Sequence, residues 1–384
     1  MKIPRYDPVR ADEEIREEID SAIVRVLDIG QFISAPAVIE FAVRAARMFL
    51  GGRGVLPCAN GTDALGLVYS AARERYGGTD NDLVIVPTLT FAATASAVEL
   101  AGMHPVISCQ GKDDPFVIDY DDLAARLDSI SYKSNIVAFT VVHLYGRVTL
   151  VPDAVKKLLE ERSIALVEDA CQAFGGSFKG VAAGTQGFGA AFSFFPSKPL
   201  GCYGDGGLCV FENVDDGEYA AMLARHGTGP NNKYESITVG RNSRLDTIQA
   251  AILDVKLSYC NEARLRRMAI ARRYTEAFEK HLLDQISPPV LTKGHAMHCY
   301  TVRVDHGLRD ELMAYLRAKG IDAAVVYPHP LHAQPAFSGM RRTGLGFKEA
   351  EEIASEILTL PCWDGMTSDE INTVISSVID FYRQ

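Results

Sequence analysis

Four short apolar runs, separated by segments with a helical pattern, constrain the fold of this chain most strongly. They occupy residues 83–87, 136–142, 164–169 and 190–195. Apolar runs without polar alternation are typical of strands buried on both faces, as in a mostly parallel sheet. Because helical patterns alternate with these runs, the sequence predicts a layered α/β fold in which the sheet lies between helices.

The pattern changes near Leu245, where a long helical stretch begins and continues to about Leu283. Residues 1–245 are therefore expected to form a large domain, and residues 246–384 a smaller C-terminal α/β domain that begins with this connecting helix. A chain of 384 residues, 47% of them hydrophobic, can bury cores of this size. The elements expected after the long helix are strands at 299–304 and 322–327 and helices at 310–319, 348–358 and 368–382.

Composition and charge exclude several classes of protein. No stretch approaches ~20 uninterrupted apolar residues, so no membrane span is expected. Residues 1–7 also lack the apolar region of a signal peptide. The eight cysteines show no Cys-x-x-Cys spacing and are expected to be free thiols of a reducing compartment, which predicts a cytoplasmic protein. The net charge of −10 argues against binding to nucleic acid.

Lys198 is the first candidate for chemistry. It follows an apolar, aromatic segment and precedes a glycine-rich loop at residues 201–207. A lysine held among apolar groups has its charged form disfavoured, so its pKa falls and the free amine becomes a nucleophile. A lysine that forms a Schiff base needs this property. Taken alone, such a lysine is far more often a surface residue that follows a buried strand, and the neighbouring motifs are what single out Lys198.

Asp169 is the second candidate, because a predicted strand ends in Glu168 and Asp169. Ligands of open α/β sheets bind outside the carboxyl ends of the strands. A carboxylate placed there could keep the pyridine nitrogen of pyridoxal 5'-phosphate (PLP) protonated, and the protonated ring is the electron sink of PLP chemistry. The alternative for these two residues is a helix start or a solvated strand end.

A phosphate-binding helix start is the third candidate. Asn60, Gly61, Thr62 and Asp63 open a helical pattern that continues through Tyr69. The first turn of a helix has free N–H groups that bind phosphate together with the helix dipole. An ordinary capped helix is the alternative, since Asn60 and Thr62 are both good N-cap residues.

These segments together resemble the DegT/DnrJ/EryC1/StrS family of nucleotide-sugar aminotransferases, PLP-dependent enzymes with the aspartate-aminotransferase fold. The resemblance extends along nearly the whole chain, and the order and spacing of its motifs are more specific than any one of them. Further motifs that carry it lie at 30–34, 86–95, 143–146 and 240–246. It implies that the large domain binds PLP.

The resemblance also implies roles for individual residues. Lys198 would bind PLP as a Schiff base, and Asp169 would pair with the pyridine nitrogen. Gln172 would approach the phenolic oxygen of the ring, and Phe91 would stack on its face. The residues implied to hold the phosphate within one subunit are Gly61, Thr62, Asp63 and Ser193.

Two further groups of residues follow from the resemblance. Asn242 would reach the phosphate of the cofactor in the neighbouring subunit, which implies a homodimer with shared active sites. Its neighbour Arg241 stands where the family often has an apolar residue and could contact the sugar nucleotide. The segment with Tyr327, His329 and His332 would lie by the substrate entrance, or be a purely structural loop. No third and fourth ligand can be placed beside the two histidines, so no metal site is predicted.

The expected reaction is the transfer of an amino group from L-glutamate to a keto-sugar linked to a nucleotide diphosphate. The resemblance favours C3 of a 3-keto hexose, with uronic acids among the candidates; a 4-keto sugar is the alternative. A PLP-dependent sugar dehydratase would have a histidine in place of Lys198. A regulator without catalytic activity would have no need for the full set of Lys198, Asp169, Thr62 and Asn242.

Overall fold

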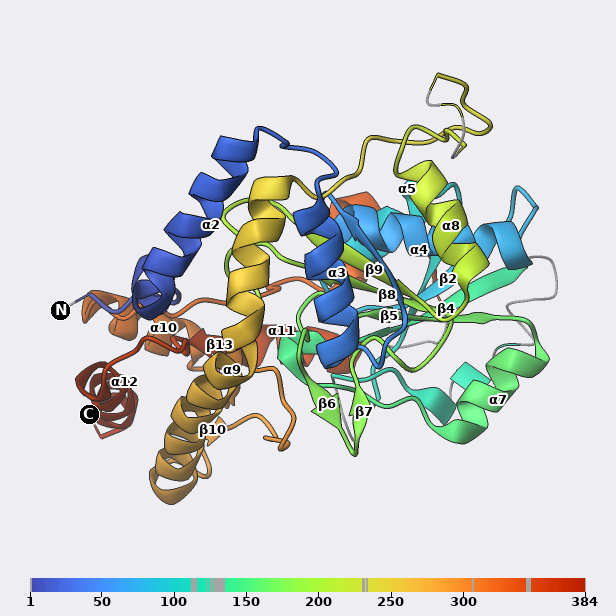
Figure 1. The fold of residues 1–384 in the computed structure, drawn as a ribbon. Coiled ribbons are helices and arrows are strands. Elements are labelled where there is room, and N and C mark those ends of the chain that lie inside the picture. The colour runs from blue at the N-terminus through green and yellow to red at the C-terminus, as the bar shows by residue number, and fades with distance from the viewer. Residues whose placement is uncertain are drawn as a thin grey trace.

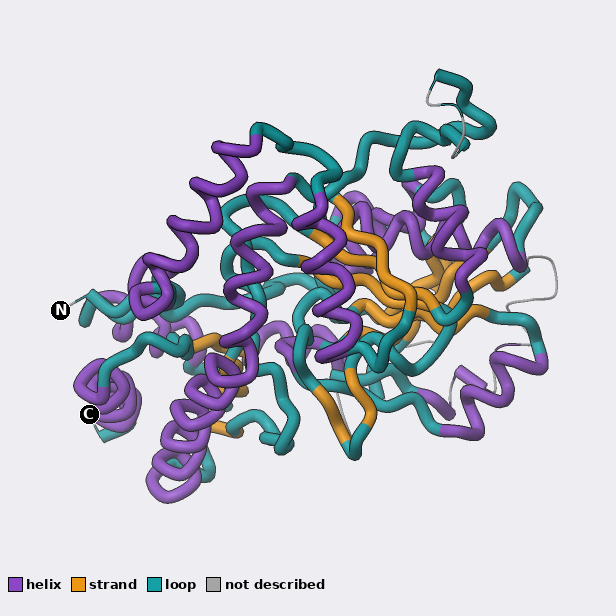
Figure 2. The backbone as a smooth tube through the Cα atoms, in the orientation of Figure 1, coloured by secondary structure: helices purple, strands orange, loops and turns teal. Residues whose placement is uncertain are grey.

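A single large sheet covered by helices forms the centre of the computed structural model (Figure 1). The structure describes residues 2–111, 116–121, 123, 124, 127, 135–229, 232, 234–305, 307–342 and 347–383. In Figure 2 the strands of this sheet lie between helices on both sides. This arrangement confirms the predicted α/β fold class.

The large sheet has eight strands and is mostly parallel. From β8 to β12 every neighbouring pair is parallel, whereas β1 and β9 run antiparallel at one edge. The four apolar runs of the sequence form β2, β4, β5 and β8, at adjacent central positions. In spatial order the strands are β1 (Gly54–Cys58), β9 (Gly207–Phe211), β8 (Gly189–Ser193), β5 (Ala165–Asp169), β4 (Ile136–Val142), β2 (Leu83–Pro87), β3 (His104–Ser108) and β12 (Arg341–Arg342).

Alternate residues of the central strands pack against helices on opposite faces of the sheet, because successive side chains of a strand point in opposite directions. In β2, Val84 and Val86 belong to the core under α4 (Gly61–Tyr76), whereas Leu83 and Ile85 belong to the core that contains residues of α7 (Asp153–Glu161). The other helices around the sheet are α3 (Pro36–Phe49), α5 (Ala93–Leu100), α8 (Val214–Leu223) and the first half of α9 (Thr247–His281).

The C-terminal part has its own small sheet and its own buried core. Its antiparallel strands are β10 (Ile286–Ser287), β11 (Tyr300–Val304) and β13 (Ile357–Leu360), and its helices are α10 (Arg309–Ala318), α11 (Lys348–Glu356) and α12 (Ser368–Phe381). Ile3, from the opposite end of the chain, is buried in this core. The division at residue 245 stays a prediction.

Two expected elements of this part differ from the structure. The strand expected at 322–327 forms only an isolated bridge between Ala324 and Thr359. Tyr327 has a φ of 70°, in the left-handed region that a strand does not use, so no strand can extend through this residue. The helix expected at 348–358 ends at Glu356, and the residues after it form β13.

The N-terminal segment and several short elements complete the described structure. They are α1 (Pro8–Ala11), α2 (Arg16–Ile29), the 3-10 helices η1 (Glu13–Ile15), η2 (Leu144–Gly146), η3 (Leu331–Ala333) and η4 (Pro335–Phe337), and the hairpin of β6 (Ser177–Phe178) and β7 (Val181–Ala182).

Two expectations from composition can be compared with the structure. No described helix has both the length and the apolar character needed to cross a lipid bilayer. All eight cysteines are free thiols, as expected.

Candidate active site

A cavity of about 640 Å³ lies where β5 and β8 end and α4 begins. This is the position at which open α/β sheets bind ligands, and the volume is ordinary for a small-molecule site. The smaller C-terminal sheet and the N-terminal segment supply the opposite side of the cavity. Eight residues predicted for the site line it together: Gly61, Thr62, Phe91, Asp169, Gln172, Ser193, Lys198 and Tyr327.

Asp169 ends β5 with its carboxylate held by two donors. The hydroxyl of Thr94 donates to Oδ2 at 2.7 Å, and the backbone N–H of Cys171 donates to Oδ1 at 3.2 Å. Thr94 is itself hydrogen-bonded to the Thr90 hydroxyl at 2.8 Å. These bonds fix the orientation of a carboxylate that lines the cavity, which a partner for a ring nitrogen requires.

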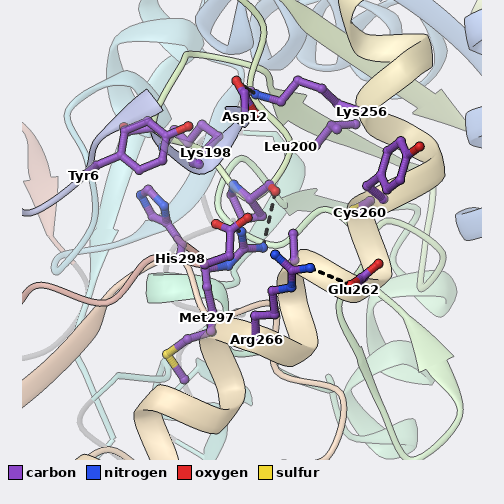
Figure 3. A pocket seen from close by; sticks show the side chains of 18 of the residues that line it. Tyr6, Asp12, Lys198, Leu200, Lys256, Cys260, Glu262, Arg266, Met297 and His298 are labelled. Atoms are coloured by element: carbon purple, nitrogen blue, oxygen red, sulfur yellow. Dashed lines mark hydrogen bonds and ion pairs between the residues drawn. The ribbon is translucent and has the colours of Figure 1, made fainter. Parts of the chain in front are cut away.

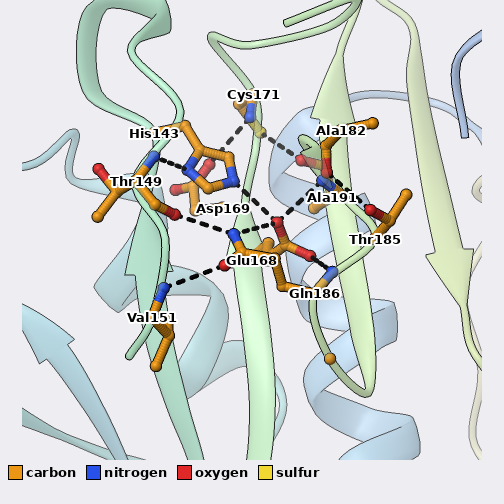
Figure 4. Close-up of polar contacts among 12 residues, drawn as sticks. His143, Thr149, Val151, Glu168, Asp169, Cys171, Ala182, Thr185, Gln186 and Ala191 are labelled. Carbon is orange, nitrogen blue, oxygen red and sulfur yellow. Dashed lines mark hydrogen bonds and ion pairs between the residues drawn. The ribbon is translucent and has the colours of Figure 1, made fainter. Parts of the chain in front are cut away.

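Glu168 belongs to a separate buried network, on the other side of the same strand (Figure 4). Its Oε2 accepts from the His143 Nε2 at 2.9 Å and from the Gly184 N–H at 2.9 Å, and its Oε1 accepts from the Gln186 N–H at 2.6 Å. The Thr149 N–H donates to Nδ1 of the same imidazole, so Nε2 carries the proton. Burial alone would raise the pKa of Glu168, but these hydrogen bonds outweigh burial and lower it.

The start of α4 provides a compact anion-binding site. The Asn60 side chain caps the helix by accepting from the Asp63 N–H at 2.8 Å, which leaves the N–H groups of Gly61 and Thr62 available. A Cβ on Gly61 would lie 2.7 Å from the Ser193 Cβ, so only glycine fits between the helix and β8. The Ser193 hydroxyl therefore lies beside the first turn of the helix, where a phosphate group can bind to both.

Lys198 lies in the loop after β8, and its backbone N–H is held by the Phe195 carbonyl at 2.9 Å. Its side chain lines the main cavity together with Asp169. Burial raises the pKa of the nearby Cys299 thiol to about 11, and the Lys198 charge opposes this rise. The charge of the Lys198 amine thus favours the thiolate form of Cys299, another residue that lines the cavity.

Gln172 connects two aromatic residues of the cavity wall. Its Oε1 accepts from the Tyr145 N–H at 2.7 Å, and its Nε2 donates to the Tyr327 hydroxyl at 2.8 Å. The Tyr145 and Tyr327 rings are stacked with centroids 6.2 Å apart, and Phe91 packs against Tyr327 at 5.8 Å. Both tyrosines have positive φ angles, 57° and 70°, and such backbone strain is concentrated at functional sites.

A second, smaller cavity of about 70 Å³ adjoins the loop of Lys198 (Figure 3). His298 and Lys198 line both cavities and lie between them. Within the described part of the chain, Nδ1 of His298 has no hydrogen-bond partner. Burial, followed by the charge of Lys198, lowers the pKa of His298 well below its ordinary value, so the imidazole is uncharged at neutral pH.

Five predicted residues lie outside the main cavity of the single chain: Asp63, Arg241, Asn242, His329 and His332. His332 is buried between the Thr88 hydroxyl, 2.6 Å from Nδ1, and the Glu351 carboxylate, 3.0 Å from Nε2. Arg241 lies 3.8 Å from the Asp63 carboxylate. Asn242 is exposed and accepts from the Arg244 side chain at 3.0 Å.

Several residues of the cavity were not predicted. They include Thr94, which holds Asp169, and Arg5, Tyr6 and His298, which line the cavity. Thr94 stands at the start of α5, shortly after the end of the predicted strand at 83–87, and this position beyond a strand end could have identified it. Arg5 and His298 have no comparable signal, because their neighbours in space are distant in sequence.

The cavity fits PLP on three independent features. The start of α4 with Ser193 offers an anion site, Asp169 offers an oriented carboxylate, and Lys198 offers an amine in the same space. The group that these residues suit has a phosphate, a ring nitrogen and a carbonyl carbon that an amine attacks. PLP has all three.

Comparisons with known proteins agree with this geometry. The "Pleiotropic regulatory protein" of Geobacillus stearothermophilus is 32% identical over 100% of this chain and 99% of its own length. The UDP-2-acetamido-2-deoxy-3-oxo-D-glucuronate aminotransferase of Pseudomonas aeruginosa is 36% identical over 95% of this chain and 96% of its own.

A solved structure with a similar fold is that of S. venezuelae DesV in complex with a ketimine intermediate. It superimposes with a TM-score of 0.88 at 33% identity, and the alignment covers 100% of this chain and 99% of that one. The family match extends over residues 13–379. The chain therefore belongs to the DegT/DnrJ/EryC1/StrS aminotransferase family, and PLP is its cofactor.

Proposed function

We propose that this enzyme transfers the amino group of L-glutamate to C3 of a keto-sugar linked to a nucleotide diphosphate. The observation that carries the proposal is the convergence of Lys198, Asp169 and the start of α4 on one cavity. The family consists of aminotransferases, and these side chains supply an amine, a carboxylate and an anion site, which that chemistry needs.

Bound PLP supplies an electron-withdrawing ring that accepts the electron pair left on the donor's α-carbon when its proton departs. Asp169 holds a proton at the ring nitrogen, and the bonds from Thr94 and Cys171 keep its carboxylate in place. The N–H groups of Gly61 and Thr62 and the Ser193 hydroxyl bind the phosphate. Gln172 donates to Tyr327 and accepts from Tyr145, which orients this wall beside the ring.

Lys198 moves the proton. Its Nζ, once free, takes the proton from the donor's α-carbon and later returns one to the sugar carbon that receives the amine. Because the same amine is needed in both halves of the reaction, one lysine in the cavity is sufficient. The loop after β8 holds its backbone, and the side chain reaches the cavity from there.

The position on the sugar is supported by the relative from P. aeruginosa, which is named as acting on a 3-oxo-glucuronate. This favours a 3-keto sugar, and a uronic acid in particular, over the 4-keto alternative. The relative from G. stearothermophilus is named as a regulatory protein, which favours the alternative of a regulator without catalytic activity. The intact catalytic set favours an enzyme, because a regulator needs no amine and oriented carboxylate in one cavity.

A homodimer with shared active sites is part of the proposal. Asn242 is exposed and does not line the cavity of its own chain, and the nearby residues 234–240 extend from the body of the molecule (Figure 1). Tyr234, Ile237 and Val239 on this segment are exposed, and Val239 has 93% of its surface accessible. Exposed apolar side chains on a projecting segment favour burial against a second copy of the chain.

Spectroscopy tests the reaction directly. The protein reconstituted with PLP is expected to show a visible absorption band that L-glutamate bleaches. A panel of 3-keto and 4-keto nucleotide sugars, matched in sugar and nucleotide, is then added to the bleached enzyme. Recovery of the band with 3-keto sugars supports the proposal. Recovery only with 4-keto sugars would move the reaction to C4, and no bleaching by any amino donor would exclude transamination.

A further inference from the structure

The charges that line the main cavity are few. Among its described lining residues the cationic side chains are Lys198 and Arg5, and the carboxylates are Asp169 and Asp205. His298 also lines it but is uncharged at neutral pH, because burial and then the Lys198 charge lower its pKa. Once Lys198 is engaged by the cofactor, Arg5 is the described cation that remains for an anionic substrate.

The N-terminal segment is fixed to the smaller domain, so Arg5 has a defined place. Ile3 pairs with Ile321: its N–H donates to the Gly320 carbonyl at 2.8 Å, and its carbonyl accepts from the Asp322 N–H at 2.9 Å. The Trp363 indole donates to the Pro4 carbonyl at 3.0 Å. These contacts place the backbone of Arg5 at the edge of the cavity. The residues that hold this segment lie more than 300 positions further along the chain.

The guanidinium of Arg5 is free to bind a ligand. Its backbone N–H donates to the Asp322 carboxylate at 3.3 Å, but its side chain has no hydrogen-bond or ion-pair partner in the described part of the chain. By contrast, Arg10 in the same segment is paired with Glu370 at 2.7 Å. An arginine fork matches a carboxylate through two parallel hydrogen bonds.

Arg5 lines the same cavity as Lys198, and the next residue, Tyr6, also lines the smaller cavity beside Lys198. Burial raises the pKa of Cys299, and the charges of Lys198 and Arg5 both oppose this rise. Burial, and after it the charges of Lys198, Arg267 and Arg5, lower the pKa of His298. Arg5 and Lys198 line the same cavity as Cys299 and His298, so both cations border the space that the donor enters. A small amino acid that reacts at Lys198 therefore has an arginine in the same cavity to which it can present a carboxylate.

We propose that Arg5 binds a carboxylate of the dicarboxylic amino donor. The proposal rests on the proposed transamination with L-glutamate and adds the group that recognises the donor. A nucleotide diphosphate is also anionic, but it belongs to a much larger substrate that need not place its phosphates beside Lys198. The site holds a carboxylate from donor binding to keto-acid release, since the donor and its keto-acid product share this group.

Binding of glutarate to the PLP-loaded enzyme tests the proposal without turnover. Glutarate has the carbon chain and both carboxylates of the donor but no amine. Its binding can be followed by calorimetry and by the shift of the visible absorption band. Replacing Arg5 with glutamine is expected to weaken glutarate binding about tenfold or more, because a charged hydrogen-bonding group is lost. Arg5→Lys keeps the charge without the fork and should recover part of the affinity.

Lys2→Gln is the matched control, because it removes the same charge from an exposed position of the same segment. It should bind glutarate as the unmodified enzyme does. UDP serves as the probe for the alternative anion, and its affinity should change less than twofold in Arg5→Gln. Unchanged glutarate affinity in Arg5→Gln, or a loss confined to UDP, would overturn the proposal.

The same experiment separates this proposal from the proposed function. If L-glutamate bleaches the Arg5→Gln enzyme at the normal concentration, Arg5 is not the donor site, while transamination stands. If the unmodified enzyme neither binds glutarate nor is bleached by L-glutamate, the choice of donor is wrong and the Arg5 proposal fails with it.

Discussion

The two walls of the cavity differ in how firmly their side chains are held. On the sheet wall, Asp169 has two hydrogen-bond donors, and Gly61 leaves no room for a side chain against Ser193. On the opposite wall, Arg5 is exposed, and its side chain has no hydrogen-bond or ion-pair partner in the described part of the chain. A site for a resident group needs fixed geometry, whereas a site for exchanging substrates must open and close. The sheet wall suits the cofactor and the opposite wall suits the substrates.

The largest effect is expected at Lys198 on the sheet wall. Lys198→Ala should abolish steady-state turnover, because the amine that moves the proton is lost. The measurement is amino transfer from L-glutamate under saturating PLP, with bound cofactor quantified by absorbance. Lys179→Ala, an exposed lysine on a hairpin turn, serves as the control. A turnover number near that of the unmodified enzyme would remove Lys198 from the mechanism.

Asp169→Asn tests the same wall through the ring nitrogen. The amide cannot hold that nitrogen protonated, so transamination should fall by at least about tenfold, which corresponds to about 1.4 kcal/mol of barrier. Thermal unfolding should change little, since the amide oxygen can still accept from Thr94 or from the Cys171 N–H. A smaller loss of rate in a fully folded variant would show that Asp169 is not the partner of the ring.

Asn242 tests whether a second copy of the chain completes the cavity. Lys198→Ala and Asn242→Ala are each expected to be strongly impaired as pure proteins. When they are mixed and exchange subunits, each mixed dimer contains one site with both native groups, so up to about a quarter of the normal activity should return. Differently tagged subunits verify that mixed dimers form. If they form without any gain in activity, the sites are not shared.

Glu168 should matter for stability where Asp169 matters for rate. The pKa of Glu168 is lowered in the folded protein, so its contribution to stability is present above the unfolded pKa of about 4.3 and is lost as pH falls through the folded pKa. Glu168→Gln should destabilise the protein by about 3 kcal/mol near pH 7, because a buried hydrogen-bonded charge is removed from its network. It should also flatten the loss of stability in acid.

Chemical denaturation at several pH values between 3 and 7 measures this effect. Glu352→Gln, on an exposed helix, is a control that removes a carboxylate without a buried network. Equal stability of Glu168→Gln and the unmodified protein at pH 7 would contradict a structural role for the network in Figure 4.

The smallest effect is expected at Arg241. Its guanidinium is 3.8 Å from Asp63 and lies next to the exposed Asn242, so in a dimer it could reach the sugar nucleotide of the other site. Arg241→Leu should raise the KM for the sugar nucleotide severalfold and leave bleaching by L-glutamate unchanged. Absorbance measurements of each half-reaction separate the effect on the sugar nucleotide from the effect on L-glutamate. Equal effects on both halves, or on neither, would show that Arg241 does not select the acceptor.

The strand ends and helix start of the sheet wall could be predicted from the sequence because their signals are local. The apolar run that ends at Asp169 identifies a strand and its last residue, and the pattern that begins at Asn60 identifies a helix and its first turn. Strand alternation then places Glu168 and Asp169 on opposite sides, and Asp169 lines the cavity, as expected from the sequence. The Glu168 network needs residues 143, 184 and 186 together, and no local pattern joins them.

The sequence alone determined the α/β class and the family, and it predicted Lys198 and Asp169, which the structure places in one cavity. Apolar periodicity and motif spacing are properties of neighbouring residues, so a sequence can show them. Only the tertiary structure decided that Arg5 and His298 reach the same cavity, that His332 is enclosed by Thr88 and Glu351, and that residues 322–327 leave the sheet. These outcomes depend on contacts between segments far apart in the chain. Such contacts are selected by the packing of the whole core, which no short stretch of sequence encodes.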